Sequence, residues 1–162
     1  MRRHGFEMHD VFCSAPGNLG EELESFHRIV GEVNEAVGMP HKTLLAPLCL
    51  KSNNLILIAA DPAKDNIRYC SFFVQVLKDS WGPVGLFREL YDVAAECRRD
   101  EQAPMREIAV FVKPPGSVEI PGDSPVHRYD TLASFESQLR TVLTRWLSGV
   151  LASTPSESPS PR

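Results

Sequence analysis

The chain has 162 residues, of which 43% are hydrophobic and 23% charged, and a formal net charge of −4, which together are typical of one soluble globular domain with its own core. The mild negative charge argues against nucleic-acid binding, which requires a basic surface. The absence of an apolar run of about 18 residues, or of a signal peptide within residues 1–13, predicts a cytoplasmic protein that does not enter a membrane.

The ends of the chain are expected to differ from the middle. Residues 1–8 are expected to form a flexible N-terminus, and residues 153–162, STPSESPSPR, a disordered Ser/Pro-rich tail. A single α/β domain would then span residues 9–152. The four cysteines lie within or beside apolar runs without CxxC spacing, which indicates buried free thiols and no metal site: Cys13, Cys49, Cys70 and Cys97.

The first predicted strand covers residues 9–14, and a loop, APGN, leads from it to the clearest helix of the chain. Asn18 is in position to cap this helix, with Glu21 at the capping-box position, and Gly38 followed by Pro40 predicts its end. Its apolar residues recur at alternating steps of four and three and form one stripe: Leu19, Leu23, Phe26, Val30, Val33 and Val37.

Two apolar runs follow the helix. Residues 43–50, TLLAPLCL, predict a strand at a sheet edge or a bent strand, because Pro47 cannot donate to a ladder. Residues 54–60, NLILIAA, predict a more regular strand. The sequence allows two arrangements: the two runs could pair as a hairpin, or one of them could lie outside the sheet.

The second half of the chain alternates helices and strands. Residues 61–71 predict a short helix or turn with Pro62 at its first helical position. Residues 72–77, FFVQVL, predict a central strand, and residues 106–113, REIAVFVK, another buried strand. A helix is predicted after each of these two strands, and Asp130 is expected to cap the second helix. Each helix is predicted by its apolar stripe: Phe87, Leu90, Ala94 and Cys97 for the first; and Leu132, Phe135, Leu139, Val142, Leu143, Trp146 and Val150 for the second.

Strands that are apolar throughout and alternate with helices predict a mostly parallel sheet of about five strands, covered by helices on both faces. In such a sheet, ligands bind in the crevice outside the carboxyl ends of the strands. Three loops are expected at that edge: CSAPGN, KDSWGPVG and KPPGS.

The order of the segments SAPGNLGEE, DSWGP, FRELYDVA and MREIAVFVK resembles TIR-like domains of bacterial STAND and defence proteins, over about residues 9–147. More distantly it is similar to the nucleoside 2-deoxyribosyltransferases. The resemblance implies a flavodoxin-like or TIR-like three-layer αβα sandwich. In both families an acid that follows a central strand attacks or stabilises the anomeric carbon of a ribosyl group.

Carried over position by position, the resemblance implies that Glu89, in FREL, is the key carboxylate and that Asp79 lies in the polar loop before it. The chain departs from the TIR pattern where a Ser and a Cys would precede the glutamate, and from the Asp-Ser-Gly-Thr loop of the deoxyribosyltransferases. The ligand-binding residues are expected to be the following: Ser14, Ala15, Gly17, Asn18, Ser80, Trp81, Gly82 and Asp92.

The chemistry of these side chains is consistent with that role. Cleavage of an N-glycosidic bond develops oxocarbenium character, which the carboxylate of Glu89 could stabilise or trap. Asp79 or Asp92 could orient a hydroxyl or protonate the base, and Trp81 offers a flat face for a base. The simpler interpretation makes Glu89 a surface residue that stabilises the helix dipole and Trp81 a loop anchor.

Three hypotheses follow. The first is a domain that binds a nucleotide or nucleoside, with NAD as a substrate rather than a cofactor, and cleaves its N-glycosidic bond. The second is a non-enzymatic nucleotide-sensing or self-association module of bacterial signalling or defence, as a homodimer or a tethered effector domain. The third is a flavodoxin-like redox protein.

Overall fold

The computed structural model describes residues 2–3, 5–16, 19–49, 56–82, 85–114 and 118–153, and only the backbone of residues 2–3 and 56–61. The elements, in chain order, are β1 (Arg2–Arg3), β2 (Phe6–Ser14), α1 (Gly20–Val33), the π-helical η1 (Asn34–Gly38), the 3₁₀ η2 (Met39–His41), β3 (Thr43–Cys49), α2 (Ile56–Arg68), β4 (Phe72–Leu77), α3 (Leu86–Arg99), β5 (Glu107–Val112), β6 (Val126–Arg128) and α4 (Leu132–Ser153).

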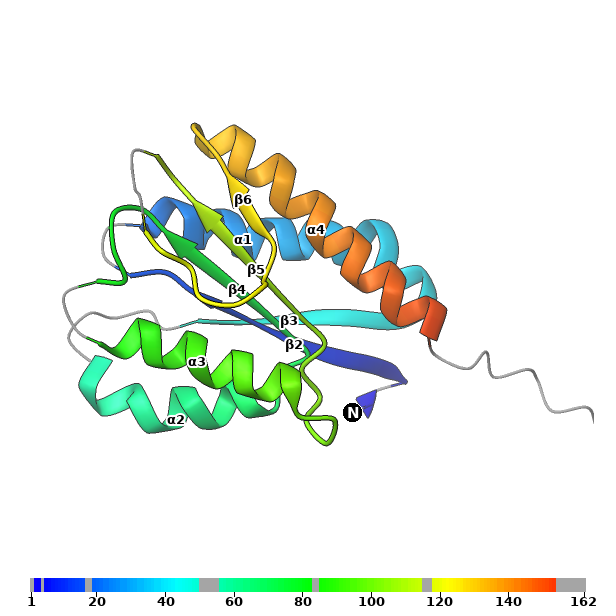
Figure 1. The fold of residues 1–162 in the computed structure, drawn as a ribbon. Helices are drawn as coiled ribbons and strands as arrows, with labels where there is room; N and C mark the ends of the chain where they lie inside the picture. The colour runs from blue at the N-terminus through cyan, green and yellow to red at the C-terminus, as the bar shows by residue number, and fades with distance from the viewer. Residues whose placement is uncertain are drawn as a thin grey trace, which may run out of the picture.

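The strands form one sheet whose five longer members are parallel (Figure 1). Their spatial order is β3-β2-β4-β5-β6, and the short β1 pairs antiparallel with the start of β2. This is the strand order of flavodoxin-like folds, in which the chain starts near the middle and reverses direction across the sheet once. The predicted fold class, a three-layer α/β sandwich with a mostly parallel sheet, is confirmed.

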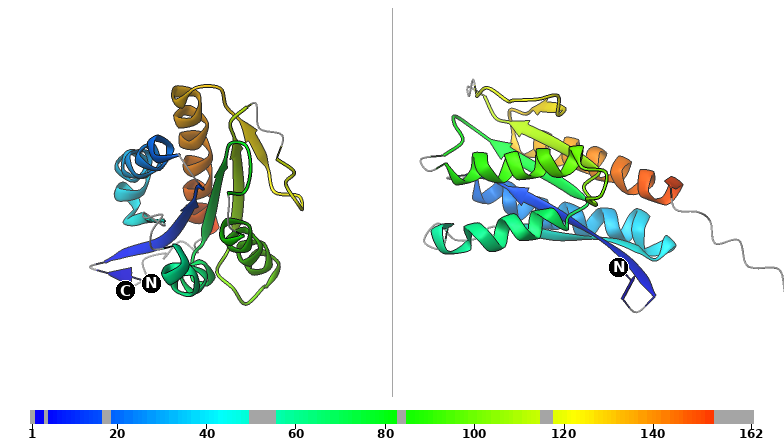
Figure 2. Two further views of the ribbon diagram at one scale, coloured as in Figure 1. Left: turned by 90° about the vertical axis from the view of Figure 1, so that its left-hand side faces the viewer. Right: turned by 60° about the horizontal axis from the view of Figure 1, so that its bottom comes forward.

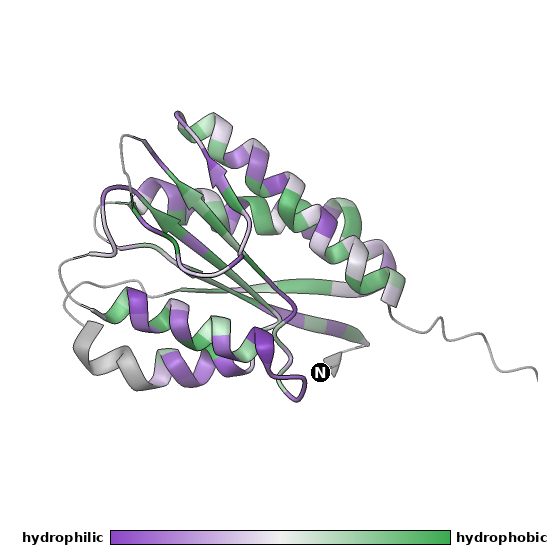
Figure 3. Cartoon of the chain, viewed as in Figure 1, coloured by the Kyte–Doolittle hydropathy of each residue, from purple (hydrophilic) through white to green (hydrophobic). Residues whose placement is uncertain are grey.

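The helices cover the sheet on both faces, with α1 and α4 on one and α2 and α3 on the other (Figure 2). Alternation along β2 sends Val11 and Cys13 into the core under α1 and α4, and Phe12 into the core under α2 and α3. Phe72 stacks on Trp146 of α4, with ring centroids 4.9 Å apart. Figure 3 shows the matching pattern: the inner strands are mainly hydrophobic, and the helices carry one hydrophobic and one hydrophilic side.

Of three sequence predictions for the middle of the chain, the structure confirms one and contradicts two. In the predicted run 43–50, Thr43–Cys49 do form an edge strand, β3, which contains Pro47 and, among the described strands, pairs with β2 alone. The strand predicted at residues 54–60 is wrong where the structure describes it, because α2 already begins at Ile56 and holds Pro62 in its interior. The hairpin is also excluded, because β3 runs parallel to β2 and its chain must return through a crossover helix before the next parallel strand.

The element boundaries also differ from the predictions. β2 begins at Phe6, so that strand structure reaches into the segment expected to be flexible. α1 has Leu19 as its N-cap without a side-chain cap hydrogen bond, and the predicted cap, Asn18, lies outside the described residues. The cap of α4 is Thr131 rather than Asp130, because Thr131 Oγ1 accepts from the Ser134 N–H at 3.1 Å. The predicted tail lies outside the described residues beyond position 153.

Candidate functional site

The strand order reverses between β2 and β4, whose carboxyl ends lie side by side at one edge of the sheet. β2 ends at Ser14, and β4 continues to Leu77. The helices that leave these two strands, α1 and α3, lie on opposite faces of the sheet (Figure 2). Open α/β sheets bind ligands at this place because the two chains diverge there.

Two buried polar side chains mark the edge. Ser14 and Gln75 are opposite each other in the β2–β4 ladder, with exposed fractions of 1% and 0%. Gln75 Nε2 donates to the carbonyl oxygens of Ser14 and Val76, at 3.0 and 3.3 Å. Among the described residues, neither Ser14 Oγ nor Gln75 Oε1 has a hydrogen-bond partner. A buried polar atom left unpaired costs about 1–3 kcal/mol, so this pair is a local cost in stability at the carboxyl edge of the sheet.

Gln75 was missed by the sequence reasoning. The signal for it was present, because Gln75 is the one polar residue in the strand FFVQVL. A polar side chain in a strand that is buried on both faces requires a partner, and the strand order decides which partner is near.

The loops that follow β2 and β4 touch each other. Gly82 has a φ of +95°, and a Cβ on it would lie 3.0 Å from Pro16 Cβ and 3.4 Å from the Phe87 ring. Gly82 is therefore required both by its backbone conformation and by the approach of Pro16. Its N–H donates to Ser80 Oγ at 3.1 Å, which fixes the turn that contains Trp81.

The side chain of Trp81 is held by a hydrogen bond and by two contacts with its ring. Its indole N–H donates to the carbonyl oxygen of Glu119 at 3.3 Å, and its ring lies 5.2 Å from that of Tyr91. The guanidinium carbon of Arg88 lies 5.5 Å from the ring centroid, and Arg88 also pairs with Asp92 at 3.1 Å. These contacts make Trp81 an anchor between the loops that follow β4 and β5.

Glu89 lies in the first turn of α3, and its side chain is 57% exposed. Its Oε2 forms an ion pair with Lys64 Nζ of α2 at 3.0 Å. Asp79 lies exposed in the bend after β4. Within the described residues, no hydrogen bond or ion pair joins Glu89 to Asp79 or Ser14, so the predicted site residues share an edge of the molecule without forming one cluster.

The remaining predicted residues belong to the loop after β2. Ala15 is partly buried against the core under α1 and α4, while Gly17 and Asn18 lie outside the described residues. α1 and α3 begin at this edge with the N-caps Leu19 and Gly85, and neither has a side-chain cap hydrogen bond. Within the described residues, no side chain therefore caps the first N–H groups of these two helices, which is the kind of position that binds anions in many proteins.

A buried acid lies beside this loop on the face covered by α1. Glu22, in the first turn of α1, accepts a hydrogen bond of 2.7 Å from the hydroxyl of the buried Tyr129. Burial and the Glu22 carboxylate raise the pKa of Tyr129. Burial, Cys49 and Glu22 raise the pKa of Cys13, so Cys13 remains a neutral thiol and does not act as a nucleophile.

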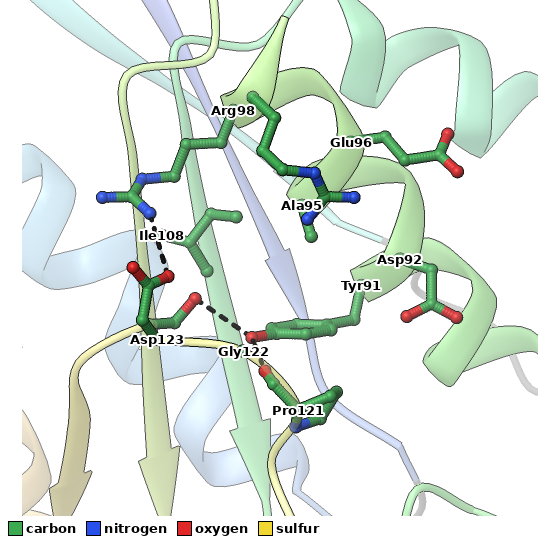
Figure 4. Close-up of a pocket in the computed structure, with 11 residues that line it drawn as sticks. Tyr91, Asp92, Ala95, Glu96, Arg98, Ile108, Pro121, Gly122 and Asp123 are labelled. Carbon is green, nitrogen blue, oxygen red and sulfur yellow. Dashed lines mark hydrogen bonds and ion pairs between the residues drawn. The ribbon is translucent and has the colours of Figure 1, made fainter.

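A separate cavity of about 400 Å³ lies between α3 and the segment before β6 (Figure 4). Tyr91 points across it and donates to the carbonyl oxygen of Pro121 at 3.0 Å. Arg98 reaches Asp123 at 3.4 Å on one side, and Asp92 lies on the other. Because Arg98 already pairs with Asp123 and the Tyr91 hydroxyl already has a protein partner, we assign no ligand to this cavity.

Among the residues described, no group of three or more His, Cys, Asp or Glu side chains is placed to hold a metal ion. No helix in that part of the chain combines the length and the hydropathy required to cross a membrane. Comparison of the chain with protein-family models, with curated proteins and with solved structures found no match.

Proposed function

We propose that this protein binds a nucleotide or nucleoside at the carboxyl edge of its sheet, between the ends of β2 and β4. The observation that carries the proposal is a pair of buried oxygens, Ser14 Oγ and Gln75 Oε1, for which no described residue is a hydrogen-bond partner, at the point where the strand order reverses. Gln75 Oε1 is an acceptor, and the Ser14 hydroxyl donates and accepts. Such a pair suits a ribose hydroxyl or the amino group of a base.

The helix ends at the same edge support the nucleotide part of the proposal. The N-termini of α1 and α3, which no described side chain caps, offer backbone N–H groups and the positive end of the helix dipole. A phosphate group is the ligand chemistry that fits them best. Ser80, Trp81 and Gly82 then shape the loop between this position and α3.

We extend the proposal to cleavage of the N-glycosidic bond, with Glu89 as the key carboxylate. Glu89 lies in the first turn of α3, the helix that follows β4, and its role would be to stabilise the oxocarbenium character of the sugar. To reach the sugar, Glu89 has to leave Lys64. A partly exposed ion pair of this kind is worth under about 1 kcal/mol, so its release opposes the reaction little.

The test is incubation of the wild-type protein and E89Q with NAD and a panel of nucleosides and deoxynucleosides, followed by chromatography. E101Q is the matched control, since Glu101 is an exposed acid just beyond the end of α3. We expect released nicotinamide or free base from the wild type and E101Q, and a loss of at least about 100-fold in E89Q. Equal turnover by E89Q would show that the assigned mechanism is wrong.

A non-enzymatic role is the second candidate, and the Lys64–Glu89 ion pair favours it. A carboxylate already neutralised by a lysine is suited to holding two helices together. In that case a nucleotide raises the melting temperature without being consumed, or the protein associates as its concentration rises. The absence of both turnover and a melting shift with every nucleotide and nucleoside of the panel would contradict the binding proposal itself.

A further inference from the structure

A second cavity, of about 500 Å³, lies at the opposite, amino edge of the sheet. It is lined by His9 of β2 and by Ser71, the residue just before β4. Along β2, His9 lies five residues before Ser14, and along β4, Ser71 lies four residues before Gln75. The groups found here are therefore independent of the site proposed above.

The side chains of Ser71, His9 and Glu7 form a chain of polar contacts. His9 Nδ1 lies 3.1 Å from Ser71 Oγ, which is hydrogen-bonding distance. Glu7 Oε2 lies 3.4 Å from His9 Nε2, within ion-pair reach but longer than a well-formed hydrogen bond, and no other described group partners this nitrogen. Glu7 and His9 are two residues apart on one strand, so their side chains share a side.

This arrangement favours one of the two neutral forms of the His9 ring. A carboxylate beside Nε2 favours the N–H there, which leaves the lone pair of Nδ1 facing the hydroxyl of Ser71. Nucleophile, base and orienting acid thus follow one another in the order used for acyl transfer. In apo proteins such contacts are often longer than in complexes with substrate.

The backbone holds Ser71 in place. Its N–H donates to the carbonyl oxygen of Asp10 at 2.9 Å, and its carbonyl oxygen accepts from the Arg106 N–H at 2.7 Å. His9 pairs with Leu45 of β3, and its strand, β2, also pairs with β1 and with β4. A nucleophile and a base fixed on two adjacent strands keep their separation, as catalytic groups require.

The lining of the cavity indicates the class of substrate. Met8, Ala46 and Pro104 supply apolar surface. Tyr69, 76% exposed, adds an aromatic ring. Asp10 adds negative charge to the same cavity, which disfavours anionic ligands.

We propose that Ser71 is an acyl-accepting nucleophile, activated by His9 and positioned by Glu7, that takes acyl groups from small uncharged esters. Ser71 Oγ bonds to the carbonyl carbon while its proton passes to His9 Nδ1. The bond to the alcohol oxygen breaks, and that oxygen takes the proton from His9. Water then attacks the Ser71 ester, gives a proton through His9 to the departing Ser71 oxygen, and releases the carboxylic acid.

The first experiment is labelling with an uncharged alkyl fluorophosphonate, read by intact mass and peptide mapping. We expect one adduct on Ser71 in the wild type and in S148A, whose serine is exposed on α4, and none in S71A. An adduct of equal yield in S71A, or no adduct in the wild type, would overturn the proposal. H9N should label at least about 100-fold more slowly, since this is the usual contribution of a general base.

The second experiment follows hydrolysis of p-nitrophenyl butyrate and separates the positioning role of Glu7 from a structural one. We expect E7Q to lower kcat about tenfold or more with KM unchanged, while E35Q, at an exposed acid of η1, behaves as the wild type. Because H9N can also lose the packing of β2, the melting temperatures of all variants are compared. S71C offers a check that does not depend on ester turnover, since His9 should make its thiol react with iodoacetamide faster than any wild-type cysteine does. Unchanged kcat in E7Q, or an unreactive S71C, contradicts the proposal.

Discussion

Lys64 of α2 and Glu89 of α3 form an ion pair, with Nζ 3.0 Å from Oε2, that links the two helices on one face of the sheet. The side chains are 26% and 57% exposed, so the attraction between them is screened by water. The pair therefore contributes little to stability and leaves the carboxylate of Glu89 able to move.

We expect K64M and E89Q each to change the free energy of unfolding by less than about 1 kcal/mol, as measured by urea denaturation. In the nucleotide assay, K64M should keep its turnover and E89Q should lose it, because E89Q removes the carboxylate that the proposed reaction uses, whereas K64M only releases that carboxylate from its ion pair. Loss of turnover in K64M to the level of E89Q would instead assign the function to the ion pair as a unit.

Replacement of Gln75 by methionine separates binding from stability. Q75M removes two hydrogen bonds and also the unpaired Oε1, two effects of opposite sign and similar size, so we expect unfolding to change by about 1 kcal/mol or less. The rise in melting temperature caused by a bound nucleoside should disappear. Q102M, at an exposed glutamine after α3, is the control and should keep that rise. A full ligand-induced shift in Q75M would show that the buried pair does not bind the ligand.

Two glycines should respond to alanine in opposite directions. At Gly38, the last residue of η1, a Cβ would lie 2.2 Å from the carbonyl oxygen of Thr43 and 3.2 Å from Leu147 Cδ2. We expect G38A to destabilise the protein by about 1–3 kcal/mol because η1 and β3 must separate. Gly31 lies exposed inside α1 with no atom near its Cβ position, so G31A should stabilise by about 0.5–1 kcal/mol. Equal effects in thermal unfolding would contradict this explanation.

Acid should destabilise the protein through His127. Burial, with a smaller effect from Arg145, lowers the pKa of His127, whose ring stacks on Phe111 at 4.9 Å. The folded protein therefore disfavours the charged ring, and stability falls as pH drops below about 6.5, the value in the unfolded chain. H127F keeps the stack and cannot be protonated.

The measurement is urea unfolding at pH 7.5 and pH 5.0. The wild type should lose more stability between the two than H127F does, and H41Q, at an exposed histidine, should follow the wild type. A loss in H127F as large as that of the wild type would assign the acid sensitivity to other groups.

The sequence by itself determined the elements whose signal is local. The stripe that includes Phe26 and Val30 predicts α1 because an apolar residue at every third or fourth position can face a core only in a helix. FFVQVL predicts β4 because a short run in which five of six residues are apolar needs cover on both faces. The alternation of these elements was enough to predict a parallel, three-layer fold.

Only the tertiary structure decided the rest, because these features depend on which strands become neighbours. Residues 56–60 are as apolar as a strand, but the parallel pairing of β3 with β2 places them in the crossover helix. The pairing of β2 with β4 brings Ser14 to Gln75, and His9 to Ser71, across more than sixty residues of chain. No pattern of spacing contains such contacts, since they arise from strand order and register, which are fixed by the packing of the whole core.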